Sequence, residues 1–329
     1  MVLSRRFYDD GLISIKLTKK QLKTRDEVKR KERKKYYTFC DMKCDCGNTK
    51  EFEVIAEKDR YGLPVKTCIC KRCGLIMTNP TYDQESLNRF YDEDYRNLYV
   101  AYDGPNKNFF DEQYNHGILI GNYIDQYRKL NESTRILEIG TGAGGILKAI
   151  NEKYGSKVIG IDLGSEYIEF GKLHGLELYQ ESAEVHTQKG NKYDVIILSH
   201  VIEHFLDLKH ELDQIKKLLV ADGIVYIEVP GIRNTYKTYG TLIKSLQNAH
   251  VRYFSLNTLK QTMNCYGFSF ITGDEFIRSI FKMDGTEGNG IIRNYYQEDI
   301  AFLKSHEKAY IWYTTIRPLL ARMKHRIFG

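Results

Sequence analysis

The chain has 329 residues and a mass of 38.4 kDa, which is more than one average domain and less than three. With 42% apolar and 28% charged residues it can bury a core, and this excludes wholesale disorder. No window approaches the roughly 20 apolar residues of a membrane-spanning helix, and residues 1–37 lack the apolar centre of a signal peptide. We therefore expect a cytoplasmic protein that can also lie peripherally at the inner membrane surface.

The basic residues are concentrated at the two ends of the chain. Residues 1–37 carry 13 Lys/Arg against five Asp/Glu, and residues 302–329 carry six against one, whereas the net charge of the whole chain is only +6. The body is therefore acidic. Two interpretations stay open, because charge runs are either solvated faces or surfaces that attract an anionic partner.

The cysteines predict a metal site. Six of the seven lie between Cys40 and Cys73, and an odd total without an export signal argues against a disulfide framework. Two clusters end in Cys-Gly, where glycine gives backbone N–H groups room to approach the sulfurs. We expect a structural Zn²⁺ held by four thiolates, from Cys44, Cys46, Cys70 and Cys73. Cys40 and Cys68 are spare candidates, and the alternative is reduced cysteines packed as small hydrophobes.

An aromatic and acidic stretch over residues 82–102 comes next, and it connects the cysteines to a helical pattern near residues 109–130. Its tyrosines are candidates for core residues or for a lid.

From residue 135 onward, short β-rich runs alternate with helical ones. The predicted strands are 135–139, 157–161, 176–179, 193–198 and 223–229. The predicted helices between them are 146–153, 165–174 and 207–220. Such alternation is typical of an α/β fold with a parallel, doubly wound sheet. A helix at 255–266 and a late strand at 268–272 are also predicted, and the residues from there to about 299 show no assignable pattern.

A glycine-rich turn follows the first predicted strand and opens a helix, so the backbone there can approach a ligand closely. Gly140, Gly142 and Gly145 satisfy the dinucleotide pattern G-x-G-x-x-G, whereas Glu138, Gly140, Gly142 and Gly144 satisfy E-x-G-x-G-x-G. Glu138 decides between them, because a carboxylate repels a pyrophosphate and suits a ligand with an ammonium and a sulfonium. S-adenosylmethionine is such a ligand.

The segment 135–148 resembles motif I of class I S-adenosylmethionine-dependent methyltransferases. Asp162 ends the next predicted strand, where the family accepts hydrogen bonds from both ribose hydroxyls, although NAD enzymes use this position too. The order of strands and motifs matches the family over about residues 109–273. The resemblance implies a Rossmann-like methyltransferase domain with S-adenosyl-L-methionine as its cofactor.

The resemblance also places cofactor contacts at the ends of the first four strands, with the segment after the third strand against the adenine. The expected cofactor-binding residues are Glu138, Gly140, Thr141, Gly142, Gly144, Asp162, Leu163, Ser182, Ala183, Glu184 and Ser199.

Methyl transfer is an in-line displacement, so the protein must mainly align the acceptor and remove its proton. We expect the base at the carboxyl ends of the fourth and fifth strands, from His200, Glu203, His204 or His250. The run from His200 to His204 also satisfies the zinc-peptidase pattern H-x-x-E-H, but it lies where methyltransferases carry a similar Glu-His pair. A histidine there can instead cap a helix or line the cofactor.

The runs 73–80 and 90–95 resemble bacterial methyltransferases with an N-terminal zinc ribbon, many of which act in surface-glycan and deoxysugar pathways. This favours an O-methyltransferase whose acceptor is a sugar hydroxyl of a glycan or nucleotide-sugar intermediate. One alternative is an RNA methyltransferase that recognises its substrate with the zinc ribbon and binds phosphates with its basic ends. Another is a non-catalytic zinc-ribbon interaction protein. The sequence leaves the acceptor atom and the oligomeric state open.

In the C-terminal tail, apolar residues fall on one face at helical spacing between basic residues. They are Trp312, Ile316, Leu319, Leu320, Met323 and Ile327. Such a helix can lie on an anionic membrane, which suits a lipid-linked glycan precursor, or pack on the body or a second subunit. We expect Pro318 to limit the regular helix to the residues after it.

Five consecutive parts are predicted. They are a basic extension (1–37), a zinc-ribbon module (38–80), a connecting helical segment and lid (81–134), the methyltransferase domain (135–301) and a basic amphipathic tail (302–329).

Overall fold

The computed structural model describes all residues except 1, 100–103, 285–292 and 319–329. The described residues group by contacts into two compact units. Unit 1 takes its residues from Met1–Asp94, Pro230–Thr258 and Ile291–Gly329, and unit 2 from Tyr95–Val229 and Leu259–Gly290. Unit 1 thus draws on all five of the consecutive parts predicted from the sequence, because contacts between distant segments leave no mark on local composition.

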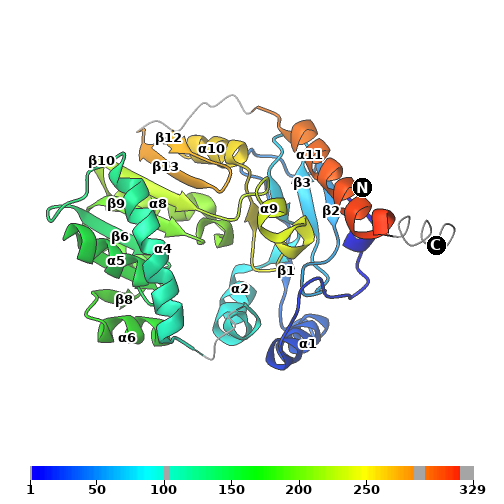
Figure 1. Cartoon of the computed structure of the whole chain (residues 1–329), viewed down its shortest axis with the longest axis horizontal. Helices are drawn as coiled ribbons and strands as arrows, with labels where there is room; N and C mark the ends of the chain where they lie inside the picture. The colour runs from blue at the N-terminus through cyan, green and yellow to red at the C-terminus, as the bar shows by residue number, and fades with distance from the viewer. Residues whose placement is uncertain (1, 100–103, 285–292, 319–329) are drawn as a thin grey trace, which may run out of the picture. The chain divides into compact units, whose positions relative to one another are not determined.

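Unit 2 is built on a seven-stranded sheet in the order β12-β13-β10-β9-β6-β7-β8 (Figure 1). Its strands are β6 (Arg135–Ile139), β7 (Lys157–Asp162), β8 (Leu178–Gln180), β9 (Tyr193–Ser199), β10 (Leu219–Glu228), β12 (Phe268–Gly273) and β13 (Arg278–Met283). The strands from β6 to β10 are parallel, and β13 and β12 are added antiparallel. This confirms the predicted α/β, doubly wound, mostly parallel fold.

The helices of unit 2 alternate with these strands. They are α3 (Arg96–Tyr99), α4 (Lys107–Asp125), α5 (Gly145–Tyr154), α6 (Ser165–Leu173), α7 (Ala183–Thr187), the 3₁₀ turn η3 (Ile202–His204) and α8 (Leu208–Leu218). Side-chain caps fix where several begin, since Asn106 accepts from the N–H of Phe109 at 3.0 Å and Asp207 accepts from the N–H of His210 at 3.0 Å. In sequence, α10 (Leu256–Cys265) crosses from unit 1 to unit 2.

The core of unit 2 explains why its parallel strands were visible in the sequence. Ile136 on β6 and Val195 and Ile197 on β9 are fully buried with Leu147 and Ile150 of α5. Strands covered in this way read as continuous apolar runs. The antiparallel β13 was not predicted, because its pairing with β10 is formed by the fold rather than by a local pattern.

Unit 1 contains a four-stranded antiparallel sheet in the order β11-β4-β3-β2 and a separate two-stranded pair. The strands are β2 (Phe52–Ala56), β3 (Thr67–Cys70), β4 (Ile76–Thr78) and β11 (Arg252–Tyr253), with β1 (Phe39–Cys40) paired to β5 (Thr81–Tyr82). No local pattern predicted β11, which comes after β10 in the chain yet pairs with β4 beside the cysteines.

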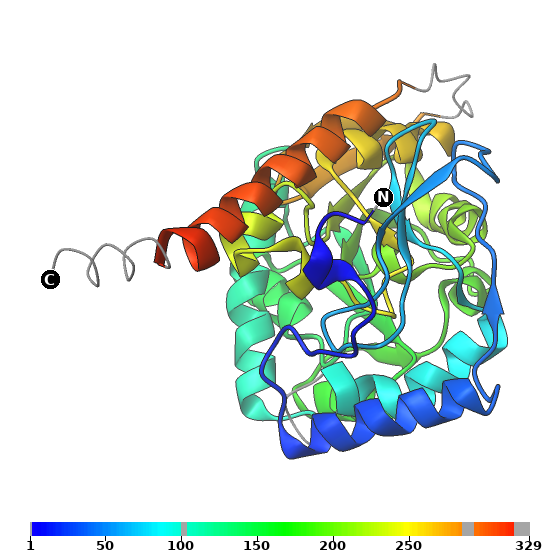
Figure 2. The same ribbon diagram turned by 90° about the vertical axis from the view of Figure 1, so that its right-hand side faces the viewer.

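The helices of unit 1 come from both ends of the chain and from the segment after β10. They are η1 (Arg5–Phe7), α1 (Lys19–Arg33), α2 (Gln84–Phe90), the π-helical η2 (Tyr91–Tyr95, whose last residue belongs to unit 2), α9 (Thr235–Tyr239), η4 (Leu242–Lys244), α11 (Tyr296–Ile311) and η5 (Trp312–Ile316). The long α11 packs beside β3, and Tyr296 at its start donates a hydrogen bond to Glu53 of β2 (Figures 1 and 2). Phe7, Ile69 and Leu303 are among the residues that join these segments in one apolar core.

The chain stays helical from α11 through η5 to Pro318, so the expected break there is wrong for the residues before it. The π-helical turn accounts for this, because its i→i+5 bonding relaxes the helix just ahead of the proline. Trp312 and Ile316 are exposed, and the other four residues of the predicted apolar stripe lie outside the described residues. No helix in the described part of the chain is long and apolar enough to cross a bilayer.

Candidate functional site

The glycine loop between β6 and α5 has the backbone geometry of a tight turn. Gly140, Gly142 and Gly144 have φ of 73°, 56° and 78°, a region that residues with side chains rarely adopt. At Gly140 a Cβ would also come within 2.5 Å of Val201. Without side chains at these positions, the loop leaves room for a ligand to approach its backbone closely.

Asp162 ends β7 and holds this loop. Its Oδ2 accepts a hydrogen bond from the N–H of Gly142 at 2.9 Å, and its Oδ1 accepts one from the N–H of Gly164 at 2.7 Å. Each carboxylate oxygen keeps a further lone pair, so Asp162 can still accept from ribose hydroxyls. The residue lies at the predicted edge of the sheet, and its contact with a ribose stays a prediction.

Glu138 is buried in β6, with only 1% of the residue exposed. Its Oε2 accepts a hydrogen bond from Oγ1 of Thr141 at 2.7 Å. Burial raises the pKa of Glu138 to about 8, with the Thr141 hydrogen bond opposing the rise and the charge of Asp162 adding to it. Glu138 is therefore mostly protonated at pH 7, and its predicted attraction to a cation requires binding to displace that proton.

The other predicted cofactor residues lie at the same edge, because β6, β7, β8 and β9 run parallel and end together. Leu163 has an exposed side chain directly after β7. Ser182 caps α7 by accepting from the backbone N–H three residues on, Ala183 is buried and Glu184 is exposed. Ser199 ends β9 half-buried. The structure thus brings the predicted residues to one edge without testing their contacts with a cofactor.

Sequence reasoning missed two residues that contact this site. Gln113 on α4 donates from Nε2 to the carbonyl of Thr141 at 3.1 Å. In α3, the guanidinium carbon of Arg96 lies 3.8 Å from the centre of the Tyr167 ring, and its Nη2 lies 3.6 Å from Oδ1 of Asp162. Neither belongs to a motif, because both meet the loop only through the fold.

Three predicted catalytic residues follow β9. His200 has a φ of 57° and a side chain that is 53% exposed, and a positive φ in such a residue is uncommon enough to suggest a functional constraint. Oε1 of the buried Glu203 lies 3.7 Å from Nδ1 of His200 and 3.9 Å from Nε2 of His204. Although desolvation by the surrounding protein opposes its charged form, the nearby Glu203 carboxylate raises the pKa of His200. These residues are placed where a proton can be held or moved.

His250 is the fourth predicted catalytic residue. It belongs to unit 1, precedes β11, and its buried ring forms a hydrogen bond with the side chain of Gln247. Its expected place at the carboxyl end of the fifth parallel strand stays a prediction. Its catalytic role stays a prediction.

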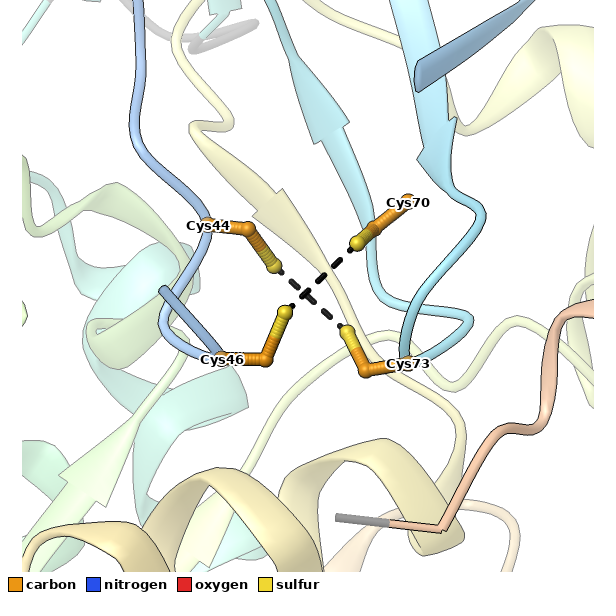
Figure 3. Close-up of side chains that lie close together, drawn as sticks. All are labelled: Cys44, Cys46, Cys70 and Cys73. Atoms are coloured by element: carbon orange, nitrogen blue, oxygen red, sulfur yellow. Dashed lines mark hydrogen bonds between the residues drawn. The ribbon is translucent and has the colours of Figure 1, made fainter. Parts of the chain in front are cut away.

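The four predicted metal ligands come together in unit 1, and Figure 3 shows their sulfurs pointing toward a common centre. The sulfurs of Cys44 and Cys73 are 3.5 Å apart, those of Cys46 and Cys70 are 3.7 Å apart, and all four lie within 4.8 Å of one another. Tetrahedral ligands about 2.3 Å from a zinc ion would be about 3.8 Å apart, so the cluster fits the ion.

The two Cys-Gly turns have the predicted form. Gly47 and Gly74 have φ of 84° and 89°. The N–H of Leu75 then donates to the sulfur of Cys73 at 3.5 Å, and Nδ2 of Asn48 donates to another of the four sulfurs at 3.2 Å. Such outer hydrogen bonds orient thiolate ligands around a metal.

A buried ion pair joins the first cysteine turn to the segment that follows β10, all within unit 1. Asp45, between two of the ligands, accepts from Nε and Nη2 of Arg252 at 2.7 and 2.9 Å. The two side chains are only 5% and 3% exposed. The contact is bidentate, so it fixes both the distance and the orientation of β11 relative to the first cysteine turn.

Cys40 and Cys68, the spare candidates, are not members of the cluster in the described residues. The Cys68 thiol donates to the carbonyl of Asn79 at 3.5 Å, and burial raises the pKa of Cys68 to about 11. A thiol in this setting stays protonated.

Comparison with known proteins identifies the glycine-loop unit. A family model described as a methyltransferase domain matches residues 112–272, a range that includes the glycine loop, Asp162 and the five parallel strands. The chain contains a methyltransferase domain. The match confirms the predicted methyltransferase domain, and relatives of this domain are named as methyltransferases.

The methyltransferase domain is similar to two curated proteins named ubiquinone biosynthesis O-methyltransferase. That of Bartonella quintana (strain Toulouse) is 30% identical over 118 residues, which cover 34% of this chain and 47% of the relative. That of Chelativorans sp. (strain BNC1) is 32% identical over 118 residues, covering 34% and 46%. The chain thus spans less than half the length of these relatives.

Solved structures resemble the chain at low identity. The plantazolicin methyltransferase BpumL in complex with SAH has a TM-score of 0.45 and 16% identity, covering 58% of this chain and 79% of that one. A SAM dependent methyltransferase from Archaeoglobus fulgidus has a TM-score of 0.41 and 18% identity, covering 63% and 93%. Likenesses at this level say nothing about the acceptor of the methyltransferase domain.

Proposed function

We propose that the chain transfers a methyl group from S-adenosylmethionine to an oxygen atom of a small acceptor. The observation that carries this proposal is Asp162, whose carboxylate accepts from the N–H groups of Gly142 in the glycine loop and of Gly164 after β7, and keeps lone pairs for ribose hydroxyls. The curated relatives are named O-methyltransferases, which supports oxygen as the acceptor atom.

The chain's own residues would hold the cofactor around its cationic centre. Asp162 would bind the ribose, the backbone of the glycine loop would lie against the ligand, and Glu138 would balance the positive charge of the ligand after losing a proton. When bound, the cofactor supplies a methyl group already activated by sulfonium. The protein must then orient the acceptor oxygen and hold the proton that leaves it.

The predicted proton acceptors are His200, Glu203, His204 and His250. Of these, His200 combines a half-exposed imidazole, a position directly after β9 and a carboxylate neighbour in Glu203. That combination lets the imidazole take up a proton near neutral pH.

For the acceptor we propose a sugar hydroxyl of a glycan or nucleotide-sugar intermediate. The support is the resemblance of the cysteine-containing segment to ribbon-bearing methyltransferases of glycan pathways. RNA is the second candidate, supported by the basic helix α1 (Lys19–Arg33), although Arg25, Arg30 and Lys31 already pair with neighbouring carboxylates.

Contact of the C-terminal tail with an anionic membrane is a separate proposal, tested by sedimentation with anionic liposomes.

We further propose that Cys44, Cys46, Cys70 and Cys73 bind one Zn²⁺ in a structural role. Four thiolates fill a tetrahedral shell and leave no position for a substrate. The ion would then stabilise the sheet of unit 1 rather than take part in methyl transfer.

Transfer of a labelled methyl group tests the proposed function. The protein is incubated with methyl-labelled S-adenosylmethionine and separate pools of nucleotide sugars, lipid-linked glycans and total RNA. Label in an alkali-stable methyl ether of a sugar is the expected result, and the Asp162→Ala variant should show little transfer. Label only in RNA would replace the sugar by the second candidate, and absence of both cofactor binding and transfer would refute the proposal.

A further inference from the structure

A histidine–carboxylate pair that belongs to no sequence motif lies at the carboxyl ends of the parallel strands of unit 2, the edge that also carries the predicted cofactor residues. We propose that His116 is the base that takes the proton from the acceptor hydroxyl, and that Glu228 is the residue that positions it. This inference rests on the proposed O-methyl transfer, and it replaces the histidines chosen from the sequence.

The pair is held by short, convergent hydrogen bonds. Nε2 of His116 lies 2.8 Å from Oε2 of Glu228, and the hydroxyl of Tyr226 donates to the same oxygen at 2.9 Å. The side chain of Glu228 is 12% exposed, whereas that of His116 is 35% exposed. The carboxylate is thus enclosed while the imidazole can still meet a substrate.

Its position matches the place where an acceptor must bind. Glu228 is the last residue of β10 and stands opposite Ser199, the last residue of β9. In open α/β sheets, ligands bind outside the carboxyl ends of such strands. One helical turn before His116, Gln113 contacts the glycine loop, so a single helix links the cofactor loop to the pair.

The chemistry of the pair suits proton removal. Although burial opposes it, the His116 hydrogen bond lowers the pKa of Glu228, which therefore stays ionised at neutral pH. An ionised carboxylate accepts from Nε2–H and leaves Nδ1 with a lone pair. Among the described residues nothing is hydrogen-bonded to Nδ1 of His116. A base oriented by a third group in this way is the arrangement that activates hydroxyls in other enzymes.

The step balances without a further reactant. The acceptor oxygen forms a bond to the methyl carbon as the carbon–sulfur bond breaks, and the sulfur keeps the electron pair of that bond. The hydroxyl proton passes to Nδ1 of His116. The products are the methyl ether, S-adenosylhomocysteine and an imidazolium that Glu228 stabilises and that later loses its proton to water.

Charged and titratable groups from three elements surround the pair and set its pH response. Tyr226 of β10 donates to the carboxylate, His200 after β9 is close enough to lower the pKa of Glu228, and Arg278 of β13 interacts with the same carboxylate. On α4 itself, Tyr123 lies edge-on to Tyr226. His200 is the rival base, since its backbone N–H donates to the carbonyl of Glu228 at 2.8 Å.

The kinetic test compares His116→Gln, His200→Gln and the control His174→Gln, which changes a histidine bonded to Phe170 outside the site. With labelled cofactor and the acceptor pool that the wild type methylates, His116→Gln should lower turnover by about 10²–10⁴-fold, with the cofactor Kd unchanged. Wild-type activity should rise with pH through the imidazole range, and this slope should vanish in the variant.

Added imidazole should restore part of the activity of His116→Ala, which a merely structural role would not allow. Turnover that survives His116→Gln but is lost in His200→Gln overturns the proposal.

A second measurement does not need an acceptor. In the ¹⁵N-labelled whole protein, NMR should show the ring proton of the His116 imidazole on Nε2, and Glu228→Gln should change that tautomer balance while His174 stays the same. A proton resting on Nδ1 in the wild type would refute the assignment of the base. If the wild type methylates nothing, the proposed function fails. The tautomer measurement tests the assignment of His116 independently, because it needs no methyl transfer.

Discussion

The cysteine cluster of unit 1 and the glycine loop of unit 2 both concentrate ligand-binding groups in short stretches of chain, but different forces hold them. The cysteine turns are supported by two- to five-residue strands, and their four thiols converge on one point. The glycine loop rests on parallel strands whose interior residues are fully buried, and its backbone N–H groups donate to the carbonyl of Ile161 and the carboxylate of Asp162. The proposed metal ion would therefore add to the order of the first region, whereas burial of apolar surface supplies that of the second.

Removal of the thiolates should have the largest effect and would break this comparison most directly. Changing both Cys70 and Cys73 to Ser should abolish metal binding and unfold the cysteine sheet, because structural zinc contributes about 10–16 kcal/mol in small modules. Elemental analysis and thermal unfolding measure the two consequences. Cys40→Ser, which changes a cysteine outside the cluster, should keep one zinc per chain. Full metal occupancy in the double variant would sink the assignment.

The ion pair between Asp45 and Arg252 comes next in size. Arg252→Met should lower the free energy of unfolding by about 3–5 kcal/mol, because it leaves a buried carboxylate without its partner. Adding Asp45→Asn should recover much of this loss, since the unpaired charge disappears with it. Denaturant unfolding of the wild type, the two single variants and the double variant gives a double-mutant cycle, which measures the coupling energy of the two side chains. If the losses in free energy of unfolding of the two single variants simply add up in the double variant, the contact does not couple β11 to the first cysteine turn.

On the glycine-loop side, Asp162→Ala should weaken S-adenosylmethionine binding by about 1.5–3 kcal/mol, the contribution of a hydrogen bond to a charged group. Calorimetry measures this change, and Glu166→Gln provides an exposed neighbouring control. The metal content of the Asp162→Ala protein should stay at one zinc per chain. Wild-type affinity in this variant would mean that the ribose binds elsewhere.

The smallest expected effect is a proton released by Glu138. Its pKa is raised to about 8, so it is mostly protonated at pH 7, and a cationic ligand favours the ionised form. Cofactor affinity should therefore increase as the pH rises from 6 to 8 and level off above that. Calorimetry in buffers of different ionisation enthalpy reports the released proton, and Glu138→Gln should abolish the release. An unchanged proton count in the wild type would limit Glu138 to supporting Thr141.

The sequence alone determined the parts of this protein that depend on neighbours in the chain. The strands of unit 2 from β6 to β10 were predicted because buried parallel strands are apolar along their length, and the glycine loop because positive φ angles demand glycine. The four clustered ligands, Cys44, Cys46, Cys70 and Cys73, were predicted because each Cys-Gly turn is a local structure.

Only the tertiary structure decided which distant segments meet. The pair of His116 and Glu228 is separated by 112 positions, and that of Asp45 and Arg252 by 207. The pairing of β11 with the cysteine sheet, and the place of His250 beside it, likewise depend on how the chain leaves the parallel sheet after β10. Such contacts form because the summed burial of many side chains outweighs the entropy of closing long loops, and no short window of sequence contains that sum.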